Sequence, residues 1–321
     1  MPKVVVTRPL PEAGLVSLRA AHEVEVYDPA VHGDADEDRL IDLARGADAL
    51  ISTVTDPVSG WVLEASSHLG IVAQFGVGVD NIDLEAARTH GIVVTNTPGV
   101  LTDATADFAF ALLLAVARHL RAADRFVRDG AFKRWETMLM LGMELRGKTL
   151  GIIGMGRIGA AMARRALGFG MKVLYHNRRR ANPGVERETC ARYAAFDELL
   201  ATSDIVSLHC ALNDDSTHLL DAEAFRRMKP TALLINTARG PVVDEEALVE
   251  ALEAGQIAGA GLDVFEREPE VHPGLLAHPR VVVAPHLASA TIEARTAMAR
   301  MASEAVRAFF HDAAEVPYRV V

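Results

Sequence analysis

An arginine, a glutamate and a histidine each follow an apolar, strand-like segment in the last third of the sequence: Arg239, Glu268 and His286. The segments span residues 232–237, 257–262 and 281–284. The carboxyl ends of parallel strands lie on one edge of a sheet, so we expect the three side chains to converge. Arginine can bind a carboxylate and polarise a carbonyl, and histidine can protonate the carbonyl oxygen beside a stabilising glutamate. Each residue alone also fits a structural or solvent-facing role, but together they predict a catalytic set for 2-keto acid reduction.

A glycine-rich turn precedes these segments. Residues 149–159 read TLGIIGMGRIG, which is the G-x-G-x-x-G pattern at the end of a strand and the start of a helical segment. Such glycines permit a tight turn and a close approach to pyrophosphate, and the helix N-terminus offers free N–H groups. We therefore predict dinucleotide binding rather than a purely structural turn, through Gly154, Met155, Gly156, Arg157, Ile158 and Gly159.

The next predicted strand ends in a basic segment. Residues 172–175 are followed by His176 and then by Asn177, Arg178 and Arg179. NAD-selective sites usually carry an acidic residue at this distance from the glycines, to bind the ribose 2′-hydroxyl, and none occurs here. Arginines suit a 2′-phosphate. The sequence therefore favours NADP(H) over NAD(H), although a solvated basic loop is the alternative.

Strands and helices alternate along almost the whole chain, which predicts parallel sheets covered by helices. Strands are expected at residues 3–7, 49–52, 71–74, 92–95 and 149–153, and one helix at 102–121. Residues 108–117 of that helix are apolar on every side, which is typical of burial in a core or an interface. A last long helix is expected at 291–310. The pattern predicts two α/β lobes, with the C-terminal helix returning to the first.

Composition excludes several classes of function. The 321 residues carry a net charge of −10, which disfavours binding to nucleic acid or to an anionic membrane. The longest apolar run, at residues 108–117, is shorter than the roughly 20 residues of a membrane span. Two cysteines without a C-x-x-C pair predict no disulfide framework, no metal site and a reducing, cytoplasmic location.

Four motifs together resemble the D-2-hydroxyacid dehydrogenase family. They are Gly151-Ile-Ile-Gly-Met-Gly-Arg-Ile-Gly159, Asn236-Thr-Ala-Arg-Gly240, Gly261-Leu-Asp-Val-Phe265 followed by Glu268-Pro269, and Pro285-His-Leu-Ala-Ser-Ala-Thr291. The resemblance extends from Val4 to the last helix. The stretches at residues 75–83 and 94–107 most resemble the glyoxylate/hydroxypyruvate reductase branch.

The resemblance implies roles for individual residues. Arg239, Glu268 and His286 match the catalytic arginine, glutamate and histidine, and Asp263 matches an aspartate near the nicotinamide. Backbone N–H groups of Val77 and Gly78 match the loop that binds the substrate carboxylate. Further cofactor contacts are expected at Thr102, Thr237, Ala238, Arg239, His286 and Ala288. Ala288 stands where many members have glycine, and Ala211 stands where proline is usual.

The resemblance also implies two Rossmann-like lobes. The substrate lobe would comprise residues 1–99 and 288–321, and the dinucleotide-binding lobe residues 100–287. Family members are usually dimers joined through the region that matches residues 100–145. Trp135 would fit that interface, and packing within its own chain is the alternative.

The predicted activity is NADPH-dependent reduction of glyoxylate or hydroxypyruvate, with His286 as the proton donor. A reductase of larger acids such as 2-ketogluconate remains open, because the sequence does not give the size of the pocket. A non-catalytic, nucleotide-sensing scaffold is the alternative from another class. Turnover of a panel of keto acids separates the two classes.

Overall fold

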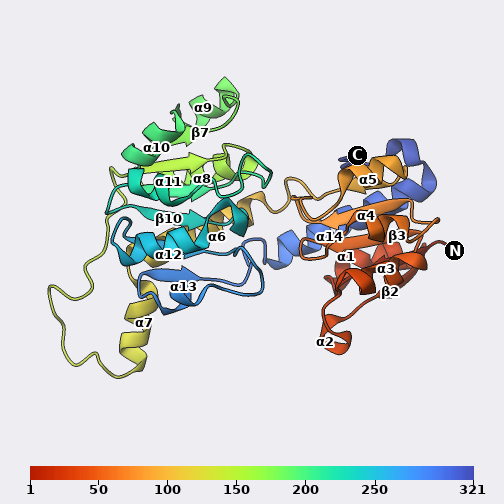
Figure 1. Ribbon diagram of the computed structural model, residues 1–321, viewed down its shortest axis with the longest axis horizontal. Helices are drawn as coiled ribbons and strands as arrows, with labels where there is room; N and C mark the ends of the chain where they lie inside the picture. Colours follow the sequence, from red (N-terminus) through yellow and green to blue (C-terminus); the bar gives the residue numbers. More distant parts are fainter. The chain divides into compact units, whose positions relative to one another are not determined.

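The computed structural model describes all 321 residues, Met1–Val321, which form two compact units. Unit 1 combines Met1–Leu101 with Ala290–Val321, and unit 2 comprises Thr102–Ser289. Figure 1 shows that each unit is a sheet with helices on both faces. Both chain ends therefore contribute to unit 1, and the predicted α/β class with parallel sheets is confirmed.

Unit 1 contains a five-stranded parallel sheet in the order β2-β1-β3-β4-β5. Its strands are β1 (Lys3–Val6), β2 (Glu23–Val26), β3 (Ala49–Thr53), β4 (Ile71–Phe75) and β5 (Val93–Thr95). Its helices are α1 (Glu12–Arg19), α2 (Pro29–His32), α3 (Glu37–Arg45), α4 (Gly60–Glu64), α5 (Leu84–Thr89), α14 (Ile292–His311) and the 3-10 turn η2 (Ala313–Glu315). Every residue of the central strands β3 and β4 is buried, as expected for a sheet covered on both faces.

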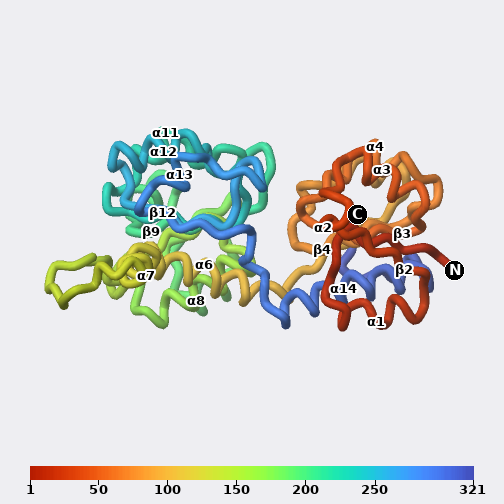
Figure 2. The backbone as a smooth tube through the Cα atoms, turned by 90° about the horizontal axis from the view of Figure 1, so that it is seen from below, coloured from red at the N-terminus to blue at the C-terminus, as the bar shows by residue number.

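The C-terminal helix α14 packs beside α1 on one face of the unit 1 sheet (Figure 2). Thr291 caps its start by accepting a hydrogen bond from the N–H of Ala294. A Cβ atom on Gly14 of α1 would lie 2.3 Å from the Cβ of Ala299, so glycine allows the two helices to approach closely. The predicted return of the last helix to the first lobe is therefore observed.

Unit 2 contains a seven-stranded parallel sheet in the order β12-β11-β10-β9-β6-β7-β8. Its strands are β6 (Thr149–Ile153), β7 (Lys172–His176), β8 (Arg192–Tyr193), β9 (Ile205–Leu208), β10 (Leu233–Asn236), β11 (Gly259–Leu262) and β12 (Val281–Val283). Its helices are α6 (Thr102–Ala117), α7 (Leu120–Arg128), α8 (Arg157–Gly168), α9 (Pro183–Thr189), α10 (Phe196–Thr202), α11 (Ala222–Arg227), α12 (Glu245–Glu253) and α13 (Pro273–Ala277), with the 3-10 turn η1 (Gly240–Val242).

The apolar helix α6 packs between α8 and the strands β10, β11 and β12, which explains why it is apolar on all sides. The prediction of one helix over residues 102–121 is wrong, because α6 ends at Ala117 and α7 begins at Leu120. His119 adopts a left-handed conformation with φ 53° and stops the α-helical pattern. The N–H of Met143 bonds to the carbonyl of Ala117 and satisfies the helix end. No helix of the protein combines the length and the apolar character needed to cross a membrane.

Candidate active site

The glycine-rich turn lies between β6 and α8, where the strand order of unit 2 reverses. Gly154 has a φ of +101°, and a Cβ there would lie 2.4 Å from the N of Cys210, which follows β9. A Cβ on Gly159 would lie 2.2 Å from the carbonyl oxygen of Gly154. Around Gly156, in contrast, the space that a Cβ would occupy is open. Two glycines are thus required for packing, and the third leaves room for a ligand.

The first N–H groups of α8 have no acceptor within the protein. Gly156 is the N-cap and provides no side-chain cap, and the N–H groups of Arg157 and Ile158 form no hydrogen bond. The N–H of Met155 is different, because it donates to Oδ1 of Asn177 at 2.6 Å. The free N–H groups and the positive end of the helix dipole favour an anion here, as a pyrophosphate requires.

The three arginines after β7 differ in their partners. Arg178 forms an ion pair with Asp215 at 2.8 Å, and both side chains are exposed. Arg180 bonds to Glu186, whose pKa is held below its usual value by that arginine. Arg179 lies between them without an ion pair. No sequence pattern points to Asp215, which lies 37 residues from Arg178 and becomes its neighbour only through the sheet.

The segment after β10 is organised by a buried asparagine. Asn236 donates from Nδ2 to the carbonyl of Arg239 at 2.9 Å and accepts the N–H of Ala238 at 3.0 Å. A Cβ on Gly240 would lie 1.8 Å from the carbonyl carbon of Phe265, so this turn lies directly against the segment that leads to Glu268. The hydroxyl of Thr237 is buried and forms no hydrogen bond, so it is available to a bound cofactor.

His286 and Glu268 form the central contact of the site. Nδ1 of His286 lies 2.8 Å from Oε2 of Glu268, and the side chains are 29% and 24% exposed. Oε1 of Glu268 accepts the N–H of Phe265 at 3.1 Å, which orients the carboxylate. Because Nδ1 is taken by the carboxylate, Nε2 is the ring nitrogen left to exchange a proton with a ligand. The structure thus brings together Glu268 and His286, both predicted to be catalytic, and Nη1 of Arg239 donates to the carbonyl of Ala238 at 2.8 Å.

Asp263 holds the turn that carries His286. Its carboxylate accepts the N–H groups of Leu287 and Ala288, both at 2.7 Å, and its backbone carbonyl accepts the N–H of His286 at 2.9 Å. Burial raises the pKa of Asp263 to about 6, against the opposing effect of the two N–H donors. His286 has a φ of 55°, an uncommon conformation that the hydrogen bonds to Asp263 maintain. This positioning contact is not visible in the sequence.

Val77 and Gly78, the predicted substrate-binding residues, belong to unit 1. They lie in the loop of residues 76–81 after β4, which we call the substrate loop. Their backbone N–H groups form no hydrogen bond within the chain. The neighbouring carbonyls form hydrogen bonds. The carbonyl of Gly76 accepts the N–H of Thr97, and the carbonyl of Val77 accepts Nδ2 of Asn96. The loop therefore presents donors without partners, as binding of a carboxylate needs.

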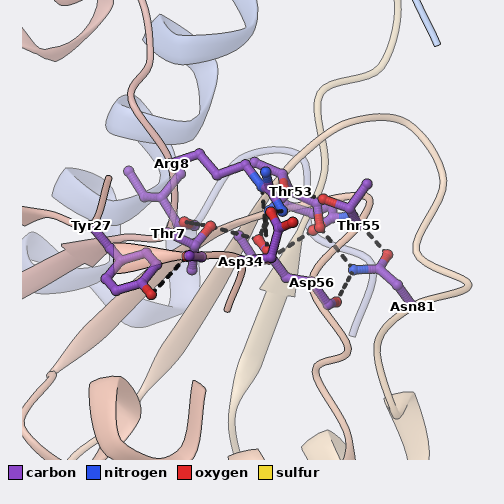
Figure 3. A network of polar contacts seen from close by, with 12 residues as sticks. Thr7, Arg8, Tyr27, Asp34, Thr53, Thr55, Asp56 and Asn81 are labelled. Atoms are coloured by element: carbon purple, nitrogen blue, oxygen red, sulfur yellow. Dashed lines mark hydrogen bonds and ion pairs between the residues drawn. The ribbon is translucent and has the colours of Figure 1, made fainter. Parts of the chain in front are cut away.

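A second group of residues in unit 1 binds a carboxylate of the chain itself (Figure 3). Asp56 is fully buried, and its Oδ2 accepts the hydroxyls of Thr7 at 2.5 Å and Thr53 at 2.9 Å and the N–H of Thr53 at 2.6 Å. The Nε of Arg8 lies 3.7 Å from Oδ1. Thr7 and Thr53 stand at the ends of the adjacent strands β1 and β3. No pattern in the sequence predicts this cluster.

Large apolar side chains are exposed on α7 and on the segment of residues 129–142, which has no regular secondary structure. In residues 129–142 the most exposed are Trp135 at 75%, Met138 at 74%, Leu141 at 62% and Phe132 at 53%. Packing of Trp135 within its own chain, the alternative considered above, is therefore wrong. Exposed apolar side chains in this number along one segment are typical of an interaction surface.

Comparison with known proteins identifies the family. Residues 110–288 match the family described as "D-isomer specific 2-hydroxyacid dehydrogenase, NAD binding domain". The chain belongs to the D-isomer-specific 2-hydroxyacid dehydrogenases. It is 50% identical to a glyoxylate reductase of Thermococcus litoralis over 96% of this chain and 93% of that protein.

Solved structures of the family agree over the whole chain. A Thermus thermophilus protein has a TM-score of 0.90 and 45% identity, covering 99% of this chain and all of that chain. An NADPH-dependent glyoxylate/hydroxypyruvate reductase of Sinorhizobium meliloti, solved with NADP and malonate, has a TM-score of 0.89 and 34% identity, covering 100% of this chain and 97% of that one. The resemblance inferred from the sequence motifs is thus confirmed.

Proposed function

We propose that this protein reduces small 2-keto acids, glyoxylate to glycolate and hydroxypyruvate to D-glycerate, and that it prefers NADPH. The observation that carries this proposal is the pairing of His286 with Glu268, with Nε2 left to exchange a proton, at the edge of a dinucleotide-binding sheet. The similarity to glyoxylate reductases supports the substrate class. Unit 2 would hold the cofactor, and unit 1 would supply the substrate loop.

The residues of the chain supply a proton and four functions that stabilise or orient the reacting groups. His286 protonates the substrate carbonyl oxygen from Nε2, while Glu268 faces Nδ1 and stabilises the imidazolium. Asp263 fixes the backbone at His286, so the ring keeps one orientation. Arg239 pairs with the substrate carboxylate and polarises the carbonyl. The N–H groups of Val77 and Gly78 bind the same carboxylate.

The residues present fit a nicotinamide dinucleotide. The N–H groups of Gly156, Arg157 and Ile158 would bind the pyrophosphate, and the orphaned hydroxyl of Thr237 would bind the cofactor near the reacting end. Further contacts are proposed at Thr102, Met155, Gly159, Asn177, Ala238 and Ala288. When bound, the reduced nicotinamide supplies the hydride that the carbonyl carbon receives.

The preference for NADPH rests on Arg178 and Arg179. Asn177, which stands where NAD-selective sites carry an acid, uses its oxygen on the glycine-rich turn and adds no negative charge. Arg179 has no ion pair to break, and the exposed pair of Arg178 with Asp215 is easily exchanged for a phosphate contact.

We also propose a homodimer in the cytoplasm. The exposed apolar side chains of residues 129–142 would become buried against a second copy, with Trp135 at the interface. Both cysteines are free thiols, which suits a reducing compartment.

The test is a set of initial rates with glyoxylate, hydroxypyruvate and 2-ketogluconate, each with NADPH and with NADH. We expect fast turnover of the two small acids with NADPH. Replacing Arg178 and Arg179 together with alanine should raise the KM for NADPH about tenfold or more and leave that for NADH nearly unchanged, because the lost contacts are charge-assisted. Arg180→Ala is the matched control, since Arg180 is engaged by Glu186.

Other outcomes of the same assay would contradict parts of the proposal. If only 2-ketogluconate is turned over, the substrate is a larger sugar acid and not glyoxylate or hydroxypyruvate. An equal rise of the KM for NADPH and for NADH in the double variant would show that Arg178 and Arg179 do not bind the 2′-phosphate. Tight NADPH binding without turnover of any acid would favour a non-catalytic scaffold.

A further inference from the structure

Gln74 is an unusual residue for its place in the sheet. It lies in β4 among Ile71, Val72, Ala73 and Phe75, and its side chain is completely buried. Burying an amide is costly unless every polar atom finds a partner. Gln74 achieves this: Oε1 accepts the hydroxyl of Ser52 at 2.7 Å, and Nε2 donates to Oδ1 of Asn81 at 2.7 Å and to the carbonyl of Gly78 at 3.3 Å.

The chemistry of the partners fixes which end of each amide donates. Nδ2 of Asn81 points at the carbonyls of Thr53 and Asp56, at 3.0 and 2.8 Å. A carbonyl oxygen only accepts, so Nδ2 must be the donor and Oδ1 must face Gln74. Gln74 must then present its own Nε2 to Asn81 and to the substrate loop. Figure 3 shows Asn81 beside Thr53 and Asp56, at the start of this chain of contacts.

These contacts set the direction of the backbone in the substrate loop. The carbonyls of Gly76, Val77, Gly78 and Val79 all accept hydrogen bonds, from the N–H of Thr97, Nδ2 of Asn96, Nε2 of Gln74 and the N–H of Ile82. Because these carbonyls are held by the protein, the N–H groups of Val77 and Gly78 keep no partner and stay available to an anion.

We propose that Gln74 is a positioning residue for substrate binding: from the buried strand β4 it holds the carbonyl of Gly78, so that the loop presents its N–H groups to the substrate carboxylate. This inference rests on the proposed function, since it needs the loop to bind a 2-keto acid. Gln74 itself makes no contact with the reacting atoms. Its loss should therefore weaken substrate binding more than the chemical step.

The test compares Gln74→Met with wild type at saturating NADPH. Methionine keeps the length and removes both hydrogen-bonding ends. We expect the KM for glyoxylate to rise about tenfold, with kcat changed by less than about twofold and the KM for NADPH unchanged. Ser52→Ala removes only the bond to Oε1 and leaves the donor on Gly78, so it should have a much smaller effect.

Two further measurements separate positioning from loss of stability. Leu40→Ala removes a buried side chain from α3 of the same unit and leaves the loop contacts in place, so it should lower Tm without changing the KM for glyoxylate. Hydrogen–deuterium exchange of a peptide covering residues 76–81 should be faster in Gln74→Met than in wild type and unchanged in Leu40→Ala.

The outcomes distinguish this inference from the proposed function. Unchanged exchange of the loop in Gln74→Met, or an unchanged KM, overturns the positioning role. If wild type turns over no keto acid, the proposed function fails. The exchange experiment then still decides whether Gln74 orders the loop, because it needs no substrate.

Discussion

The two units share a parallel, doubly wound sheet and use its reversal point in opposite ways. In unit 2, the point between β6 and β9 is an open glycine turn, whose N–H groups at Gly156 and Arg157 have no partner. In unit 1, the equivalent point between β1 and β3 is filled by the buried carboxylate of Asp56. Such points usually bind ligands. Unit 2 thus leaves its reversal point open to an external anion, whereas unit 1 fills its reversal point with the carboxylate of Asp56.

The internal carboxylate has a consequence for the neighbouring strand. Asp56 binds the ends of β1 and β3, and its backbone carbonyl accepts Nδ2 of Asn81 from the segment after β4. The N–H donors of unit 1 that we propose to bind the substrate therefore lie one strand further along, at Val77 and Gly78. The filled reversal point supports the position of the substrate loop through Asn81, whereas the open one in unit 2 is the proposed pyrophosphate site.

The largest effect is expected from closing the open reversal point. Gly154→Ala would place a Cβ 2.4 Å from the N of Cys210, in a conformation with φ +101° that alanine adopts only under strain. The turn must then shift. In a preorganised catalytic site, misplacing a group by about 1 Å lowers the rate about 100-fold, and we take the same factor for the loss of NADPH affinity. We expect the Kd for NADPH, measured by fluorescence titration, to rise at least that much.

Gly168→Ala is the matched control, because it lies in the same helix α8 and has open space around it. It should leave the Kd for NADPH unchanged. Normal NADPH binding by Gly154→Ala would show that the turn is not the pyrophosphate site, and the contrast between the two units would lose its basis.

Much of this contrast was accessible from the sequence, where the chemistry is local. The glycine pattern, and polar residues that directly follow apolar strands, predicted the turn and the edge carrying His286 and Glu268. Asp56 gave no such signal: it lies 49 residues from Thr7 and looks like an ordinary acid in a turn before Pro57. The pairing of Arg178 with Asp215 was missed for the same reason, because sheet topology alone brings them together.

The next largest effect should come from emptying the filled reversal point. Asp56→Ala leaves the buried hydroxyls of Thr7 and Thr53 and an N–H without their acceptor. The two hydroxyls keep a second contact each, to the carbonyl of Ile51 and the hydroxyl of Thr55, so the N–H of Thr53 is the donor left unpaired. Losing these bonds to a buried carboxylate costs about 2 kcal/mol in total, and we expect urea unfolding of the full chain to show that loss of stability. The Kd for NADPH should not change, because that site belongs to unit 2.

Asp34→Ala provides the comparison for this variant. Asp34 also faces Arg8, at 3.2 Å, but its side chain is 77% exposed. An exposed ion pair contributes at most about 1 kcal/mol, so its loss should be barely measurable. Equal free energies of unfolding for Asp56→Ala and Asp34→Ala would show that the buried carboxylate of Asp56 does not stabilise unit 1.

The smallest effect concerns pH and a half-buried histidine next to the open turn. His209 follows β9, and burial lowers its pKa to about 4, so it is neutral in the folded protein, with Nε2 2.9 Å from the hydroxyl of Ser207. The unfolded chain binds this proton below about pH 6.5, whereas the folded chain does not until about pH 4. His209 therefore costs stability progressively as the pH falls through that window.

Asp263 acts in the opposite direction. Its raised pKa of about 6 means that the folded protein takes up a proton there before the unfolded chain does, which favours folding as the pH falls. His209→Gln removes only the first contribution. We expect the free energy of unfolding of wild type to fall by about 1 kcal/mol more than that of the variant between pH 6.5 and 5.5. Parallel pH profiles of wild type and variant in urea titrations would show that His209 is hydrated in the folded state. The region beside the glycine turn of unit 2 would then be open to water, unlike the reversal point of unit 1 that Asp56 fills.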